Sequence, residues 1–534
     1  MIILKNRWAL SLFLGLSIFV YFWNIWINDI WIPNESFYTE AGREILENKD
    51  FVDIYYNYEH RFNKPPLTYW LVVISYLIFG VSEFATRLPI VLLALGTILL
   101  TFNIAKELFD RKVALISTFI LFFSFQFVLN SRYASPEIPL TFFFTLTLYL
   151  FLKGYKNKKF LYIFLSYIAL GLTVLTKGYP YIVLIGGIVI LYILLNNNLK
   201  LSKFWEDFRF LKLWIGLPVV IVLGFWWYFL MYFKYGDEFL NVLFKETIHR
   251  AIGGNKGFNP LFYIVAISWA FLPYSLTFYY SFVEIRKYFK KLLFPFVWFF
   301  VVLIIFTLAK GKIPVYILPA YPSMAIIVAY FLEKYKPDNR LKSYIFNGVL
   351  LLQTLVFIVG SIILVYAFKL DIFYYWIALF PLVFLIRYRE LRLLPFISAL
   401  LMFFIFSVSL LPKVEKFRPY DQIRQSVRDN FINKNIPLII EAHFWHNLPF
   451  YTERKVLRDK SLKFILEYSK EKPTLALIRR ENLRYFPNAL KLWEGRLYIK
   501  GSESRFAVFL KYVYKALRGD MSGFQDRVLI YIHK

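Results

Sequence analysis

The sequence predicts a polytopic α-helical membrane protein that carries a small α/β domain at its C-terminal end. Of its 534 residues, 59% are hydrophobic, and the mean hydropathy of +0.53 is too high for a soluble chain of this length. Apolar runs recur as far as Leu411, and from Lys413 the composition changes to mixed charge. We therefore expect residues 1–412 to form a transmembrane domain and residues 413–534 to form a soluble domain.

The apolar runs predict about thirteen transmembrane helices, each of roughly 20 residues. The first run, Trp8–Ile27, is long enough to span and has no small-residue cleavage site after it, so we interpret it as a helix and not as a signal peptide. The run Leu67–Gly80 is shorter and follows two prolines, and we expect it to lie in the interface. The other expected spans are Leu88–Ala105, Val113–Leu129, Ile138–Leu152, Phe160–Thr176, Tyr179–Leu195, Leu211–Phe233, Leu261–Phe282, Leu292–Leu308, Val315–Phe331, Tyr344–Phe368, Ile372–Ile386 and Leu393–Leu411.

The formal charge of +28 is spread over short clusters between the apolar runs. A nucleic-acid binder would gather this charge in one patch, so we expect no nucleic-acid partner. The clusters fall in alternate loops, on the side of Lys5 and Arg7, which the positive-inside rule assigns to the cytoplasm. The first loop (residues 29–84) and the tail from residue 413 are then expected on the periplasmic side of a multi-pass inner-membrane protein.

The tail contains short apolar runs that alternate with helical segments, which is typical of an α/β domain. The expected helices are Tyr420–Asn430 and Ser461–Tyr468. The expected strands are Leu438–Ile440, Thr474–Ile478, Arg496–Ile499, Phe506–Leu510 and Val528–Ile532.

The chain has no cysteine and only five histidines, which are scattered. Disulfides, thiol catalysis and cysteine-ligated metals are therefore excluded. We expect no obligatory cofactor, and whether a divalent metal takes part is left open, with Glu246 as a possible ligand.

Several charged side chains lie in the loops expected outside, where lysine and arginine are normally scarce. A single lysine there is typical of snorkelling to lipid phosphates, and the acidic segment from Asn34 to Leu46 is by itself typical of a helix on the membrane surface with a solvated acidic face. Together, the charges on one face indicate a shared anionic ligand, and a phosphate suits them. They are Lys64, Glu137, Lys177, Glu246, Arg250, Lys310 and Lys312, with Tyr316 nearby.

Five motifs occur in a fixed order. They are Asn34-Glu35-Ser-Phe-Tyr38, Asn63-Lys64-Pro-Pro-Leu-Thr-Tyr69-Trp, Glu137-Ile-Pro-Leu-Thr-Phe-Phe, Leu175-Thr-Lys177-Gly178 and Lys312-Ile-Pro-Val-Tyr316-Ile-Leu-Pro319. In this order they resemble the bacterial GT-C glycosyltransferases, in particular the aminoarabinose transferases that modify lipid A and the protein O-mannosyltransferase-like membrane proteins. The resemblance covers roughly the first 330 residues.

The resemblance implies a GT-C fold and transfer of a sugar from an undecaprenyl-phosphate or related polyprenyl-phosphate donor, with membrane lipids as surroundings. The implied acceptor is lipid A or a related glycolipid. The family pattern puts Lys64, Lys177 and Arg250 around the donor phosphate, with Tyr316 in the same pocket, and it adds Tyr38, Tyr69 and Lys312 to the substrate-binding residues.

The same family pattern places the acid of the first motif and Glu137 beside the reacting sugar. Two positions depart from it. Asn34 stands where the family usually has its principal acid, and Asn63 stands where relatives have a glutamate that can help to hold a metal. For a hydroxyl acceptor, Glu35 or Glu137 is the candidate base, whereas a phosphate acceptor needs none.

Two alternatives remain. A protein serine or threonine could be the acceptor, as in O-mannosyl transfer. A lipid or solute transporter would also use intramembrane charges and proline-broken helices, but it would predict inverted repeats and charges near the midplane, which the sequence does not display.

Overall fold

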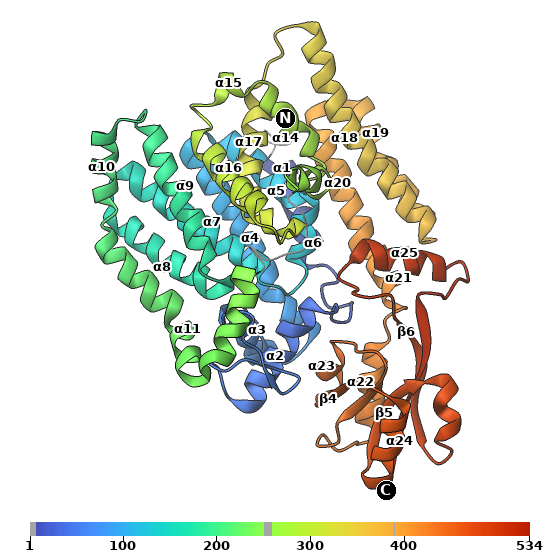
Figure 1. Ribbon diagram of the computed structural model, residues 1–534. Helices are drawn as coiled ribbons and strands as arrows, with labels where there is room; N and C mark the ends of the chain where they lie inside the picture. The colour runs from blue at the N-terminus through green and yellow to red at the C-terminus, as the bar shows by residue number, and fades with distance from the viewer. Residues whose placement is uncertain (1–6, 250–258, 389, 534) are drawn as a thin grey trace.

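The computed structural model describes residues 7–249, 259–388 and 390–533 as a helical body joined to a smaller mixed domain (Figure 1). The α-helices of the body are α1 (Arg7–Phe22), α2 (Asn34–Asn48), α3 (Leu67–Phe79), α4 (Glu83–Leu108), α5 (Arg111–Phe123), α6 (Phe125–Ser131), α7 (Glu137–Asn157), α8 (Phe160–Lys177), α9 (Pro180–Asn196), α10 (Leu201–Phe210), α11 (Leu213–Phe244), α13 (Phe262–Ala270), α14 (Ser275–Val283), α15 (Ile285–Tyr288), α16 (Leu293–Leu308), α17 (Tyr321–Lys334), α18 (Arg340–Ala367), α19 (Phe373–Tyr388), α20 (Leu394–Ile405) and α21 (Leu411–Glu415). Shorter elements are η2 (Lys245–His249), η3 (Pro314–Ala320), η4 (Leu391–Leu393), η5 (Phe406–Leu410) and the hairpin of β1 (Tyr55–Tyr56) and β2 (Glu59–His60).

The protein is a multi-span membrane protein. Among the described residues, 7 helices are long and apolar enough to cross a bilayer, or 8 if the bent pair α5 and α6 is one span. A further group of apolar helices is shorter, at 10–17 residues, and includes α3. The polytopic fold is thus confirmed, while the count of about thirteen spans stays a prediction.

Two expected spans are broken in the structure. The run Val113–Leu129 forms α5 and α6, which meet at 67°. The run Leu261–Phe282 forms α13 and α14, separated at Leu272 and Pro273, where proline cannot donate a helical hydrogen bond. A hydrogen bond joins the two breaks, because the backbone N–H of Phe125 donates to the carbonyl of Leu272 at 2.9 Å. Composition showed that both runs are apolar but not that they bend.

The N-terminal helix begins at one end of the body, and α2, α3 and the smaller domain lie at the opposite end (Figure 1). We call this opposite end the α2 end. α10 and α15, which carry basic clusters, lie toward the end where α1 begins. This arrangement puts the residues of the first loop and of the tail on one side of the molecule.

The tail folds around a five-stranded mixed sheet in the order β4-β3-β5-β7-β6. Its strands are β3 (Leu438–Glu441), β4 (Val456–Lys460), β5 (Thr474–Arg479), β6 (Leu490–Tyr498) and β7 (Phe524–Ile532). β3 pairs in parallel with β4 and β5, and β7 pairs antiparallel with β5 and β6. The helices of the tail are α22 (Tyr420–Asp429), α23 (Leu448–Thr452), α24 (Leu462–Glu471) and α25 (Phe506–Ala516), with the 3₁₀ segment η6 (Arg480–Tyr485).

One expected strand of the tail is wrong. Phe506–Leu510 begins the helix α25 and is not a strand, because Phe509, Val513 and Ala516 recur at helical spacing and are all buried. The window Phe506–Leu510 by itself is too short to display that period. The edge strand β4, whose last three residues are all charged, was missed for the opposite reason, since it has little apolar content.

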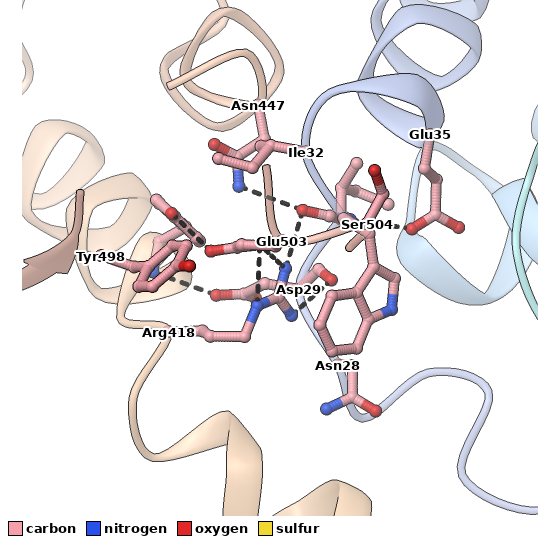
Figure 2. Close-up of polar contacts among 12 residues, drawn as sticks. Asn28, Asp29, Ile32, Glu35, Arg418, Asn447, Tyr498, Glu503 and Ser504 are labelled. Carbon is pink, nitrogen blue, oxygen red and sulfur yellow. Dashed lines mark hydrogen bonds and ion pairs between the residues drawn. The ribbon is translucent and has the colours of Figure 1, made fainter. Parts of the chain in front are cut away.

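The tail is attached to the first loop by a buried arginine (Figure 2). Arg418 forms an ion pair with Glu503 at 2.8 Å, and both side chains are fully buried. The same guanidinium donates to the carbonyls of Asp29 at 2.7 Å and Ile30 at 2.9 Å, and it lies 3.9 Å from the ring centre of Trp31. One side chain thereby connects α21, the tail and the segment before α2.

Two further contacts extend this junction. The backbone N–H of Ser504 donates to the carbonyl of Ile32 at 2.9 Å. Asn57, in the first loop, pairs with the backbone of Val456 at the edge of the sheet through both its amide nitrogen, at 3.0 Å, and its amide oxygen, at 2.7 Å. The tail is therefore held against the first loop at separate points.

We predict that Arg418→Met loosens the tail from the body. The change leaves Glu503 buried without its positive partner, which typically costs about 3–5 kcal/mol. Limited proteolysis of the purified protein in detergent should release the tail much faster than in the wild type.

A matched control is Arg496→Met, whose ion pair with Asp526 is 50% and 46% exposed and contributes at most about 1 kcal/mol. Equal protease resistance of wild type, control and Arg418→Met would contradict the assignment of Arg418 as the junction residue.

Candidate active site

Glu137 and Lys177 form an ion pair at the α2 end of the helical body. Glu137 begins α7 and Lys177 ends α8, so the antiparallel helix pair brings them together. Their Oε1 and Nζ atoms are 2.8 Å apart, and their side chains are only 15% and 8% exposed. The helix macrodipole favours a carboxylate at a helix start and an ammonium group at a helix end, so each terminus suits its residue.

Gly178 allows the chain to turn directly after Lys177. Its φ of +134° is a backbone conformation that residues with a Cβ rarely adopt. Pro180 then starts α9 at the first helical position, where its missing N–H costs nothing. The Leu175–Gly178 motif thus fixes the lysine at the very end of a helix.

Tyr316 lies beside this pair. Its ring centre is 5.2 Å from the Nζ of Lys177, within the range of a cation–π contact. Tyr316 belongs to η3, and Lys312 precedes it. The Nζ of Lys312 donates to the carbonyl of Ala309 at 2.5 Å. The structure thus brings Tyr316 to the Glu137–Lys177 pair and places Lys312 on the loop that leads to it.

Lys64 and Glu246 form a second ion pair, with Nζ and Oε2 2.9 Å apart. Their side chains are 18% and 12% exposed. A hydrogen bond joins the chain segments that carry the two ion pairs: the hydroxyl of Tyr179 donates to the hydroxyl of Thr247 at 3.1 Å. Tyr179 is two residues beyond Lys177, and Thr247 follows Glu246. The two lysines therefore lie in neighbouring parts of the same end.

The two expected tyrosines of the first loop stack on each other. The ring centres of Tyr38 and Tyr69 are 4.7 Å apart, and both side chains are buried. Arg61 donates from Nε to the hydroxyl of Tyr69 at 3.2 Å. Burial raises the pKa of Tyr38 well above its usual value, and the nearby Tyr69 and Glu137 raise it further. The Tyr38 hydroxyl therefore lies within electrostatic reach of the Glu137–Lys177 pair.

Glu35 is completely buried, and four donors contact its carboxylate. Arg87 binds both oxygens at 2.8 Å. The backbone N–H of Trp31 donates to Oε2 at 2.9 Å and that of Ala134 donates to Oε1 at 3.0 Å. Asn34, one residue earlier, is exposed at the start of α2. The structure thus surrounds Glu35 with fixed donors, an arrangement that suits a positioning role.

The acidic face of α2 is not solvated, contrary to what its sequence alone favours. Glu40 and Glu44 are fully buried, and Arg43 binds Glu40 at 2.8 Å. Burial and the neighbouring Glu40 raise the pKa of Glu44 to about 9, although the N–H of Tyr58 and Arg43 oppose the shift. Because α3, the β1–β2 hairpin and the tail cover α2, no water is left for Glu40 and Glu44, and these carboxyl groups pair with arginine or hold a proton.

The last expected phosphate ligand, Arg250, lies outside the described residues. In the part of the chain that is described, no group of three or more His, Cys, Asp and Glu side chains could hold a metal ion. Glu246, the possible metal ligand, has Lys64 as its partner instead. The expectation that no cofactor is required stays a prediction.

Sequence reasoning missed two arginines that shape this end. Arg87 lies in none of the five motifs, and its partner Glu35 is 52 positions away. Arg61 stands between the hairpin and Lys64 and belongs to no motif. Neither arginine forms a local sequence pattern with its partners. Only a signal that reports spatial contact between separate positions of the sequence could have identified them.

Comparison with known proteins identifies the family of this chain. Residues 10–238 match the family described as dolichyl-phosphate-mannose-protein mannosyltransferase. An uncharacterized protein of Aquifex aeolicus (strain VF5) is 38% identical over 498 residues, which are 92% of this chain and 94% of that protein. The chain belongs to the GT-C membrane glycosyltransferases. The family resemblance drawn from the five motifs is thus confirmed.

Characterised relatives and a solved structure agree with this assignment. The undecaprenyl phosphate-alpha-4-amino-4-deoxy-L-arabinose arabinosyl transferase of Wigglesworthia glossinidia brevipalpis is 27% identical over 351 residues, covering 63% of this chain and 60% of the relative. The crystal structure of ArnT from Cupriavidus metallidurans bound to undecaprenyl phosphate superposes with a TM-score of 0.75 at 20% identity and covers 98% of both chains. This GT-C glycosyltransferase therefore has the fold of ArnT, its C-terminal domain included.

We predict that Glu35 holds the site in place. Glu35→Gln removes the charge that Arg87 needs in a fully buried position, so the free energy of unfolding should fall by about 3–5 kcal/mol. Thermal unfolding in detergent measures this loss.

Glu47→Gln makes the same chemical change on the same helix at a side chain that is 38% exposed, and it should lower stability by at most about 1 kcal/mol. A Glu35→Gln protein with wild-type stability but no turnover would instead support a role for Glu35 in proton transfer.

Proposed function

We propose that this GT-C glycosyltransferase transfers a sugar from an undecaprenyl-phosphate donor to lipid A or a related envelope glycolipid on the periplasmic side of the inner membrane. The observation that carries the proposal is the buried Glu137–Lys177 pair with Tyr316, at the end of a body that has the fold of ArnT. The relatives whose names state an activity use an undecaprenyl-phosphate sugar.

The orientation follows from charge. The basic clusters on alternate loops favour the end where α1 begins as the cytoplasmic one, which puts the α2 end and the tail outside. The two site lysines then face the leaflet in which a flipped lipid-linked donor would present its phosphate.

Lys177 and Lys64 are the residues that we assign to the donor phosphate. In the transfer, the bond between the anomeric carbon and the phosphate oxygen breaks, and the polyprenyl phosphate leaves with the electron pair. A preorganised ammonium group in a water-poor pocket stabilises that developing charge strongly. Both lysines already neutralise a carboxylate, so the protein holds them ready without leaving a buried charge unpaired.

Glu137 is the carboxylate that we place next to the reacting sugar. Glu137 forms an ion pair with Lys177, whereas the carboxylate of Glu35 accepts hydrogen bonds from four donors of the protein itself. An ion-paired carboxylate is a weak base, because accepting a proton breaks the pair. Glu137 therefore suits the orientation of the sugar and, for a hydroxyl acceptor, a modest role in proton removal.

An acceptor that is already ionised needs no base at all. A phosphate oxygen can attack the anomeric carbon directly, so an exposed Asn34 in the place of the usual family acid is compatible with a phosphate acceptor. This favours a phosphorylated glycolipid over a serine or threonine of a protein.

Transfer to a protein is the second candidate, because the family match of residues 10–238 is named for a protein mannosyltransferase. A transporter is less well supported. The paired charges gather at one end of the body, whereas a transport path would place them near the middle of the membrane.

We predict that the purified protein in proteoliposomes releases polyprenyl phosphate from at least one member of a panel of undecaprenyl-phosphate sugars. Lys64→Ala and Glu137→Gln should each lower turnover by about 100-fold, the scale on which a single preorganised charge contributes. The assay follows transfer of radiolabelled sugar to lipid A and to a peptide in parallel.

Transfer to the peptide alone would move the assignment to a protein acceptor. A folded wild-type protein that neither turns over nor binds any lipid-linked sugar would sink the enzyme assignment and favour transport.

We also predict that Asn34→Asp changes little for a phosphate acceptor. Asparagine and aspartate have the same size, so the variant adds only a potential base at an exposed position. Initial rates with lipid A should stay within about 3-fold of wild type, well under one kcal/mol. A large gain that is confined to hydroxyl acceptors would count against the phosphate acceptor.

A further inference from the structure

Arg61 has a setting unlike that of its neighbours at the α2 end. Its guanidinium stacks on the ring of Phe37 at 3.8 Å and donates from Nε to the hydroxyl of Tyr69 at 3.2 Å. Among the described residues, no carboxylate lies within ion-pair distance of it, and it is partly exposed. The nearby arginines that do have a carboxylate partner at 2.7 or 2.8 Å are Arg43, Arg87, Arg418 and Arg424.

A second arginine, Arg458 of the tail, lies near Arg61. Phe37 packs edge-on against the ring of His446 in the tail, with ring centres 5.5 Å apart. Burial lowers the pKa of His446 to about 4, and Arg458 and Arg61 add to the shift. His446 is therefore neutral at neutral pH, mainly because it is buried, and the two arginines disfavour its charged form further. Within the described residues, the one carboxylate at ion-pair distance from Arg458 is that of the exposed Glu59, at 3.8 Å.

Contacts lead from Arg61 toward the candidate active site. Tyr69, which accepts its hydrogen bond, stacks on Tyr38, and the Tyr38 hydroxyl feels the charges of both Glu137 and Arg61. Arg61 thus reaches Tyr38 through Tyr69, on the side where the first loop meets the tail. Lys64, three residues further along the first loop, and Lys177, at the end of α8, already serve the donor phosphate in the proposed function.

We propose that Arg61 binds a phosphate group of the acceptor and thereby positions it for attack on the donor sugar. The inference rests on the proposed function and names a recognition residue within it. The terminal nitrogens of the guanidinium form a fork that matches two phosphate oxygens. Stacking on Phe37 and the bond to Tyr69 fix the plane of that fork, so little conformational entropy is lost when the phosphate binds.

Phosphate could also come from the donor, and the kinetic experiment separates the two sources. Arg61→Gln and Arg61→Lys are compared with wild type on lipid A that carries both phosphates and on fully dephosphorylated lipid A, with the donor concentration varied separately. The matched control is Arg484→Gln, an exposed arginine of the tail that stacks on Tyr485 at 5.0 Å.

For Arg61→Gln we expect the KM for phosphorylated lipid A to rise about 10- to 100-fold, as for one lost charge-assisted contact. The KM for the donor should stay within about 2-fold, and dephosphorylated lipid A, which lacks the attacking phosphate, should be a poor acceptor for variant and wild type alike. Arg61→Lys should recover part of the loss because it keeps the charge but not the fork. The control should match wild type throughout.

Two outcomes would overturn the inference. A donor KM that rises as much as the acceptor KM would mean that Arg61 serves the donor or merely supports Tyr69. A fall in kcat with an unchanged KM for phosphorylated lipid A would mean a structural role.

Direct binding keeps the test independent of turnover. Thermophoresis of the detergent-solubilised protein with lipid A, without donor, should display weaker binding for Arg61→Gln and no change with dephosphorylated lipid A. If the wild type is inactive and this binding difference holds, the proposed transfer fails and the phosphate site stands. If the binding is unchanged by Arg61→Gln, the phosphate site fails.

Discussion

The buried ion pair between Glu35 and Arg87 is the contact on which the arrangement of the α2 end depends. A buried charge is tolerated only when each of its polar atoms has a hydrogen-bond partner. In this pair the two side chains bind each other, and neighbouring backbone groups bind their remaining polar atoms. Arg87, on α4, also donates to the carbonyls of Ile25 and Asn28, while Glu35 accepts from Ala134, three residues before Glu137. The first loop, α4 and the start of α7 are therefore held in one register, and that register sets where Glu137 can meet Lys177.

The tail extends the same principle. Arg418 forms an ion pair with Glu503 and donates to the backbone carbonyls of the segment between α1 and α2 (Figure 2). Arg87 binds the same segment from the side of the helical body. The carbonyl of Asp29 accepts from both arginines. The tail, attached in this way, lies against the first loop and brings His446 and Arg458 to the vicinity of Arg61.

Helix ends and helix breaks supply the side chains of the candidate site. Glu137 and Lys177 occupy opposite termini of neighbouring helices, and Tyr316 sits in a short 3₁₀ segment ahead of α17. Irregular backbone within a membrane domain is stable only where protein or an aqueous cavity satisfies its polar groups. The same places offer charged groups to a substrate without exposing them to lipid, so the polar end of the bundle is where a phosphate-bearing lipid can be recognised.

The sequence by itself determined the membrane class, the sheet-containing tail, the position of the charged residues near helix ends and the family, because hydropathy and short motifs are local properties. It did not determine the breaks at Ser124 and Pro273 or the helix α25. Only the tertiary structure decided which charges pair, since Glu35 and Arg87 are 52 positions apart and Lys64 and Glu246 are 182 apart. Whether a carboxylate is a solvated surface group, a buried clamp or a candidate for chemistry depends on what covers it, and distant segments provide that cover.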